Sequence, residues 1–106
     1  MIPKTMRSFV MDVIRATENE TLRWREGDGN AFFCDHKDFT LHVGEYFDAD
    51  REIDSFYFRM RGAGRNLGFS VWENEDEDDF RLLKSLYENI SVNAADVSEV
   101  LKDFFK

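Results

Sequence analysis

Five short segments of alternating apolar and polar residues follow one another between Thr21 and Trp72, and they constrain the fold more than any other feature of the sequence. Alternation with a period of two is typical of half-buried β-strands. The turns between the segments are shorter than the crossover of about a dozen residues or more that a parallel pair requires. Successive strands are therefore expected to pair antiparallel, as a meander. The predicted strands cover residues 21–26, 31–35, 39–47, 55–61 and 67–72.

Apolar residues recur at helical spacing on both sides of this region. One helix is predicted over residues 4–17, and a second begins at Asp79 and ends where polar residues interrupt the pattern between Asn89 and Asn93. Asn93, with Asp96 three residues later, resembles the N-terminal cap of a last helix. The order predicts a single α+β domain over residues 1–106, with an N-terminal helix, a five-stranded antiparallel meander-like sheet and two C-terminal helices packed on one sheet face.

The balance of charge argues against nucleic-acid binding. The chain carries a formal net charge of −8, whereas phosphate contacts need clustered lysine and arginine side chains. The charge is unevenly distributed, because residues 1–25 carry +2, residues 26–58 carry −7, residues 59–65 carry +3 and residues 66–106 carry −6. We therefore expect no direct nucleic-acid partner.

Cysteine content and hydropathy indicate the cytoplasm. Cys34 is the only cysteine, so an internal disulfide is excluded and a reducing compartment is expected. The first residues lack the apolar core of a signal peptide, and no apolar run approaches the length of a membrane span. We therefore predict a cytoplasmic protein with no membrane partner.

The only local group of catalytic or metal-ligating residue types lies between Cys34 and His42. Cys34 and His36 would share one face of a strand, and His42 on the neighbouring strand would have to approach them to form a metal site or a nucleophile pair. A structural zinc site normally takes four ligands at paired spacings, which one cysteine does not supply. A buried thiol and two solvent-facing histidines are expected instead, so no catalytic residue, metal or other cofactor is predicted.

Two other segments resemble ligand-binding loops but lack essential residues. The segment that starts at Asp48 has acids at alternate positions like a calcium loop, but Ile53 stands where glycine is required and Arg59 where the closing glutamate is required. The glycines within residues 62–68 have the wrong spacing for a dinucleotide fingerprint, and a strand follows them instead of a helix. A chain this small also leaves little room for a water-excluding pocket. Enzyme activity is therefore not expected.

Six acids fall within the seven residues from Glu73 to Asp79, between the last predicted strand and the helix that follows it. Acids just before a helix offset the positive end of its dipole, which gives Asp76 to Asp79 a structural use. Glu73 and Glu75 have no such explanation. The run is therefore either a binding surface or a solvated helix entrance.

Arg59, Arg61 and Arg65 form the one basic cluster of the sequence. One interpretation is that they pair with surrounding acids, which is worth at most about 1 kcal/mol for each exposed pair. The other is a docking site for an anionic partner. Alternation places Tyr57 and Trp72 on the same outward face as the first two arginines, and aromatic and arginine side chains dominate the energetics of interfaces.

These observations favour a small acidic, non-enzymatic protein-binding or regulatory module, adaptor-like or chaperone-like, that binds a protein partner or forms a homodimer. One alternative is an inhibitor of a DNA- or RNA-binding protein that imitates nucleic acid, with the acidic runs in the place of phosphates. A phage or plasmid anti-defence protein would fit this alternative. Another is a small metal protein or enzyme centred on Cys34, His36 and His42. The predicted partner-binding residues are Tyr57, Arg59, Arg61, Trp72, Glu73, Glu75, Asp76 and Phe105.

Overall fold

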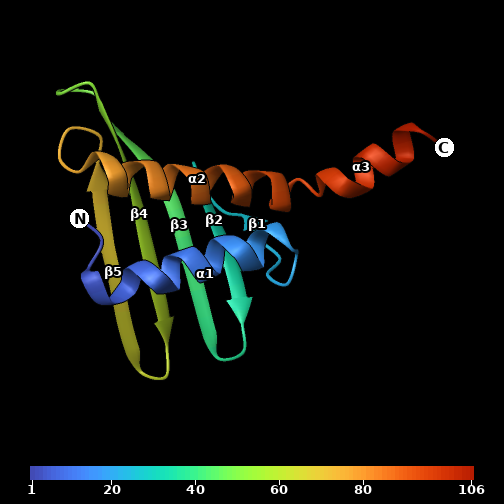
Figure 1. The fold of residues 1–106 in the computed structure, drawn as a ribbon, viewed down its shortest axis with the longest axis horizontal. Coiled ribbons are helices and arrows are strands. Elements are labelled where there is room, and N and C mark those ends of the chain that lie inside the picture. Colours follow the sequence, from blue (N-terminus) through green and yellow to red (C-terminus); the bar gives the residue numbers. More distant parts are fainter.

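The computed structural model describes residues 1–106, apart from the side chains of Val97 and Ser98. It confirms the α+β class, with one helix before a five-stranded sheet and two helices after it (Figure 1). The elements are the 3₁₀ turn η1 (Lys4–Met6), the helix α1 (Arg7–Glu18), the strands β1 (Arg25–Glu26), β2 (Ala31–His36), β3 (Phe39–Asp48), β4 (Ile53–Gly62) and β5 (Arg65–Trp72), and the helices α2 (Glu77–Ala94) and α3 (Val97–Phe104).

The sheet is a meander, as the short turns predict. Its strand order is β1-β2-β3-β4-β5, and every neighbouring pair is antiparallel. Gly62 pairs with Arg65, so only Ala63 and Gly64 connect β4 to β5. Both have positive φ, 52° and 71°, which is the type I′ geometry whose twist matches that of antiparallel strands. The glycine-rich segment 62–68 is therefore a hairpin.

The helices α1 and α2 lie side by side on one face of the sheet, and both begin near β5 and cross the strands toward β1 (Figure 1). We call this face the inner face and the opposite one the outer face. Among the described residues, no helix covers the outer face, and no helix is long and apolar enough to cross a membrane. The centre of the core consists of side chains without solvent exposure, namely Val10, Val43, Phe58, Val71, Leu83, Leu86 and Ile90.

The two C-terminal helices differ in their packing. The predicted packing on the sheet is confirmed for α2, whereas α3 contacts α2 and extends beyond the sheet (Figure 1). The chain turns between the two helices at Asp96, whose φ is 53°. Phe104 and Phe105 are consequently 78% and 85% exposed at the end of the chain.

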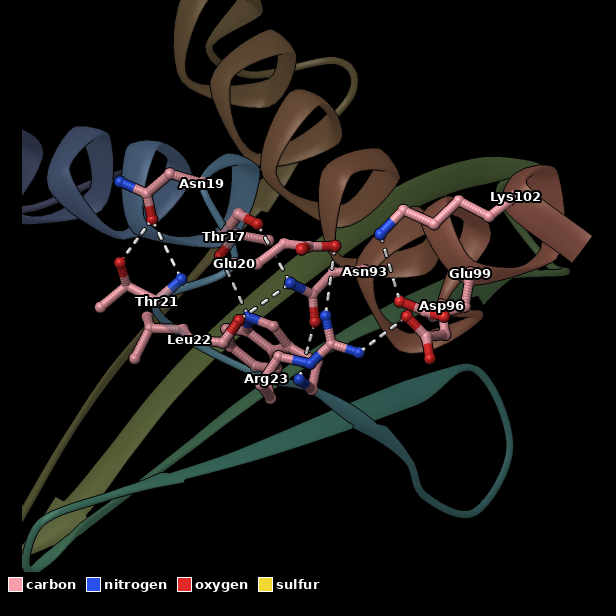
Figure 2. Close-up of polar contacts among 11 residues, drawn as sticks. Thr17, Asn19, Glu20, Thr21, Leu22, Arg23, Asn93, Asp96, Glu99 and Lys102 are labelled. Carbon is pink, nitrogen blue, oxygen red and sulfur yellow. Dashed lines mark hydrogen bonds and ion pairs between the residues drawn. The ribbon is translucent and has the colours of Figure 1, made fainter.

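Asn93 lies within α2 and is buried, and its carboxamide joins this helix to α1 and to the segment before β1 (Figure 2). Its Nδ2 donates to the carbonyl oxygens of Thr17, at 3.0 Å, and Leu22, at 2.8 Å, and its Oδ1 accepts from the backbone N–H of Trp24 at 2.8 Å. The Trp24 indole in turn donates to Thr17 Oγ1 at 3.0 Å. Both polar atoms of the buried amide are therefore satisfied.

These contacts correct two predictions. Asn93 is not the cap of the last helix, because its amide bonds to other segments and α2 continues through it to Ala94. The residue at the start of α3 is Asp96, whose side chain makes no cap bond. The first strand covers Arg25–Glu26 instead of residues 21–26, because backbone groups of Leu22 and Trp24 bond to Asn93 and not to β2.

Replacing Asn93 by leucine should remove the polar groups that satisfy this junction. The buried carbonyl of Leu22 and the N–H of Trp24 would lose their partners, while the Thr17 carbonyl would keep only its bond from the Glu20 N–H. We therefore expect the free energy of unfolding to fall by about 2–4 kcal/mol. Urea denaturation measures the change. Asn89→Leu is the matched control, because Asn89 makes one bond, to Ser85 in the same helix. Equal losses in the two variants would contradict the assigned role of Asn93.

Asp79 connects the other ends of the two helices. Its carboxylate accepts from the backbone N–H of Ile2 at 2.8 Å and from the Arg7 guanidinium, while its own N–H donates to the capping carboxylate of Asp76 at 3.0 Å. Burial by itself would raise the pKa of Asp79, but the hydrogen bonds from Ile2 and Arg7 bring that pKa below its ordinary value. The acidic run 73–79 therefore has two structural roles: Asp76 caps α2, and the buried Asp79 binds Ile2 and Arg7.

Asp79→Asn should destabilise the domain by about 1–3 kcal/mol near neutral pH, because it removes the charge that Arg7 contacts. A lowered pKa means that the carboxylate stabilises the fold above its ordinary pKa and loses this effect as the pH falls toward the lowered value. The difference between the wild type and the variant should therefore shrink below about pH 4 in urea titrations. The control Asp78→Asn changes an exposed neighbour and should show no such convergence.

Candidate functional site

The outer face of the sheet carries the largest group of predicted partner-binding residues. Strand register places Tyr57, Arg59 and Arg61 of β4 on this face, together with Trp72 of β5. Residues of opposite parity on the same strands, such as Phe58 and Val71, are buried under the helices. The period-two alternation alone therefore predicted which side chains share this face.

Three rings form a row across β2, β3 and β4, which we call the aromatic row: Phe33, His42 and Tyr57. Phe33 stacks on His42 with ring centroids 4.3 Å apart, and Tyr57 Oη lies 3.0 Å from His42 Nε2. The Tyr57 side chain lies over Gly44, where a Cβ atom would come within 2.2 Å of Tyr57 Oη. The absence of a side chain at Gly44 therefore allows the row to form.

The arginines beside this row have no acidic partner. Six of the nine arginines of the chain form an ion pair with a carboxylate. Arg59, Arg61 and Arg65 form none with the described residues, so the interpretation that they pair with surrounding acids is wrong. Arg59 instead lies over the Tyr57 ring, with its Cζ 5.0 Å from the centroid. Burial lowers the pKa of His42, and the charges of Arg59 and Arg61 lower it further.

A hollow of about 300 Å³ lies on the outer face near the β4–β5 turn, and we call it the outer-face hollow. Four strands contribute to it, and Met60 and Leu67 complete its lining. The outer-face side chains that line it are Phe33, Thr40, His42, Arg59, Arg61 and Asn66.

Trp72 lies toward the opposite end of the strands. It pairs in register with Ser55, whereas Arg61 pairs with Asn66 near the β4–β5 turn. The guanidinium of Arg51 covers the Trp72 ring at 4.8 Å. The structure therefore brings Tyr57, Arg59 and Arg61 together and places Trp72 apart from the two arginines.

The two acidic runs of the sequence meet at that same opposite end. The N–H of Glu73 donates to the carbonyl of Asp54 at 3.0 Å, and the N–H of Asp54 donates to the Glu73 carboxylate at 3.2 Å. Asp76 caps α2, while Glu75 is exposed. Glu73 and Asp76 thus have structural contacts, although the sequence left Glu73 unexplained. Phe105 is remote from both groups, because α3 extends beyond the sheet (Figure 1).

Cys34, His36 and His42 do not converge. Cys34 is buried on the inner face, where burial raises the pKa of its thiol. His36 has the parity of Cys34, whereas His42 faces outward. Among the described residues, no three acidic, histidine or cysteine side chains are close enough to hold a metal ion together.

The sequence did not identify Phe33, Thr40 or Asn66 as parts of a site, and it considered His42 only as a solvent-facing residue or as a ligand together with Cys34 and His36. The strand register places His42 and the three unidentified residues on the same face as Tyr57. The alternation of the sequence could therefore have assigned them to the outer face. Their proximity depends on the strand register, which the sequence pattern leaves open. Comparison with protein-family models, curated proteins and solved structures finds no match to this chain.

The environment of His42 predicts a pH dependence of stability. A folded-state pKa below the ordinary value means that the unfolded chain binds more protons in this range, so the free energy of unfolding should fall as the pH drops from about 7.5 to 5.5. His42→Gln removes the titrating group and should reduce this slope. Urea denaturation at several pH values measures it. An unchanged slope in the variant would show that His42 does not contribute.

Proposed function

We propose that the chain is a small non-enzymatic protein-binding module of the cytoplasm, adaptor-like or chaperone-like, whose outer face binds an acidic segment of a partner protein. The observation that carries this proposal is the pair Arg59 and Arg61, without acidic partners, beside the aromatic row on a face that no described helix covers. The single Cys34, which is free and buried, is compatible with a reducing compartment.

The chemistry of this face supports binding to a protein. Aromatic and arginine side chains are the residue types that contribute most to interface energetics. The aromatic row is fixed by stacking and by the bond between Tyr57 and His42, so little side-chain freedom remains to be lost on binding. In a chain of net charge −8, unpaired arginines on one face select for a partner surface of opposite charge.

The acidic end of the sheet favours a second candidate function, the imitation of nucleic acid. The fold brings the runs 48–54 and 73–79 together, because Asp54 and Glu73 bond to each other across the neighbouring strands. A concentrated acidic surface is what an inhibitor needs to occupy the basic groove of a DNA- or RNA-binding protein. In that case the acidic end would contact the partner, and the outer face would not.

Affinity capture from a bacterial lysate with immobilised protein tests the proposal. The double variant Arg59→Gln, Arg61→Gln should retain about tenfold less of a specific partner than the wild type, because it removes both unpaired guanidiniums. The matched control is Arg15→Gln, Arg81→Gln, which makes the same change of charge on exposed helix positions. Equal recovery by the two double variants would contradict binding through the outer face.

The same capture separates the two candidate functions. Glu73→Gln with Glu75→Gln and Glu77→Gln should leave recovery unchanged if the outer face binds the partner, and should abolish it if the acidic end imitates nucleic acid. Retention of the chain itself, lost in the Arg59 and Arg61 variant, would identify the partner as a second copy.

A further inference from the structure

The outer-face hollow holds a set of hydrogen-bond donors that have no acceptor among the described residues. Arg59 and Arg61 supply two guanidiniums from β4, and Asn66 supplies a carboxamide from β5. None of these three side chains makes a hydrogen bond with the residues that the structure describes. Thr40 is different, because its hydroxyl donates to the Asp35 carboxylate at 2.7 Å and is left as an acceptor. The available donors are therefore the two arginines and Asn66.

No carboxylate of the described residues lines the hollow. The nearest acid in register is Asp35, opposite Thr40, and it already pairs with Arg25 at 2.9 Å. The hydrogen bond from Thr40 and the charge of Arg25 keep the pKa of Asp35 below its ordinary value, so this carboxylate is ionised and has its own partners. Arg59 and Arg61 thus face the hollow without an internal counter-charge.

The guanidinium of Arg59 is held in place by contacts with the sheet. The side chain of Arg59 crosses above Gly68, where a Cβ atom would lie 3.2 Å from Arg59 Cγ, and its guanidinium rests on the Tyr57 ring. Tyr57 is fixed in turn by its contact with His42. Strands position side chains more firmly than loops do, and a prepositioned charge loses less entropy on binding. The hollow therefore has the properties of a preorganised anion site.

We propose that the outer-face hollow binds an oxyanion group between Arg59, Arg61 and Asn66, and that this group is carried by an acidic segment of the partner protein. The assignment of the ligand to a protein segment rests on the proposed function. Guanidinium groups bind carboxylate and phosphate oxygens through paired N–H donors. The stacked rings of Phe33 and His42 line the hollow beside these donors, where they would contact the neighbouring part of the segment.

A nucleic-acid strand fits these observations less well than an acidic peptide. The chain carries −8 overall, and the acidic runs 48–54 and 73–79 lie at the other end of the same strands. An extended polyanion would need further cations along its path, whereas the hollow offers two. A short acidic segment needs only one or two charges at this position.

The two histidines of the chain provide a direct test with sulfate as the probe. Sulfate keeps its charge throughout the titration of histidine, and sodium chloride at equal ionic strength is the reference. Proton NMR should show that the pKa of His42 is higher in sulfate than in chloride, because a bound dianion stabilises the imidazolium. His36 has the parity of the inner face, so its ring signals serve as the internal reference for general effects of the salt. Identical His42 curves in the two salts would overturn the proposal.

Variants of single arginines sharpen this test. Arg61→Gln should raise the pKa of His42 in chloride, because it removes a nearby positive charge, and should reduce the effect of sulfate. Arg65→Gln is the matched control, because it removes an unpaired arginine of the same hairpin that lies outside the hollow. A sulfate effect lost equally in both variants would indicate general screening and would contradict a defined site. Far-UV circular dichroism establishes that both variants are folded.

Two peptides then distinguish the source of the oxyanion. One peptide is rich in glutamate, and the other has the same length and one phosphoserine; the controls replace glutamate by glutamine and phosphoserine by serine. Each acidic peptide should bind the wild type at least about tenfold more tightly than it binds the double variant Arg59→Gln, Arg61→Gln. The tighter of the two identifies carboxylate or phosphate as the preferred group. Binding of neither would overturn the peptide assignment.

The proposed function and this inference can fail separately. Capture of a partner that depends on Arg59 and Arg61, without any effect of sulfate on His42, would support the binding module and reject the oxyanion site. A sulfate effect confined to His42, with no partner that depends on the two arginines, would support the anion site and reject the protein-binding function.

Discussion

The carboxamide of Asn93 holds together three segments that the rest of the structure depends on. It ties the end of α2 to the end of α1 and to the backbone before β1 (Figure 2). A buried amide is costly unless both its polar atoms are satisfied. Here its partners are backbone groups, and the Leu22 carbonyl and the Trp24 N–H have no other partner among the described residues. Together with Asp79 at the other ends of the helices, it fixes α1 and α2 as a pair on the inner face.

This arrangement determines which surface remains open. The helices α1 and α2 pack on one face of the five-stranded sheet, and α3 extends away from it (Figure 1). The outer face is consequently built from strand side chains alone. There the aromatic row is ordered by contacts between neighbouring strands, and the small size of Gly44 leaves space for Tyr57 to lie across it.

The meander also separates charge along the strands. The β3–β4 turn and the β5–α2 junction lie at one end and carry the two acidic runs, while the β4–β5 turn at the other end lies beside Arg59, Arg61 and Arg65. Charges of one sign gathered on a surface steer a partner of the opposite sign into a defined orientation. An acidic segment approaching the outer face would be attracted to the arginine end and repelled from the acidic end.

The sequence by itself determined the class of the fold, the antiparallel order of the strands and the parity of Tyr57, Arg59, Arg61 and Trp72. These follow from local periodicity and from turns too short for crossovers. Only the tertiary structure decided that Asn93 is a buried junction, that β1 is short and that α3 leaves the sheet. It also decided that Arg59 and Arg61, which form no ion pair with the described residues, lie beside Phe33 and His42. Each of these features depends on contacts between residues far apart in the chain. Strand register and helix docking determine those contacts, and no local sequence pattern encodes them.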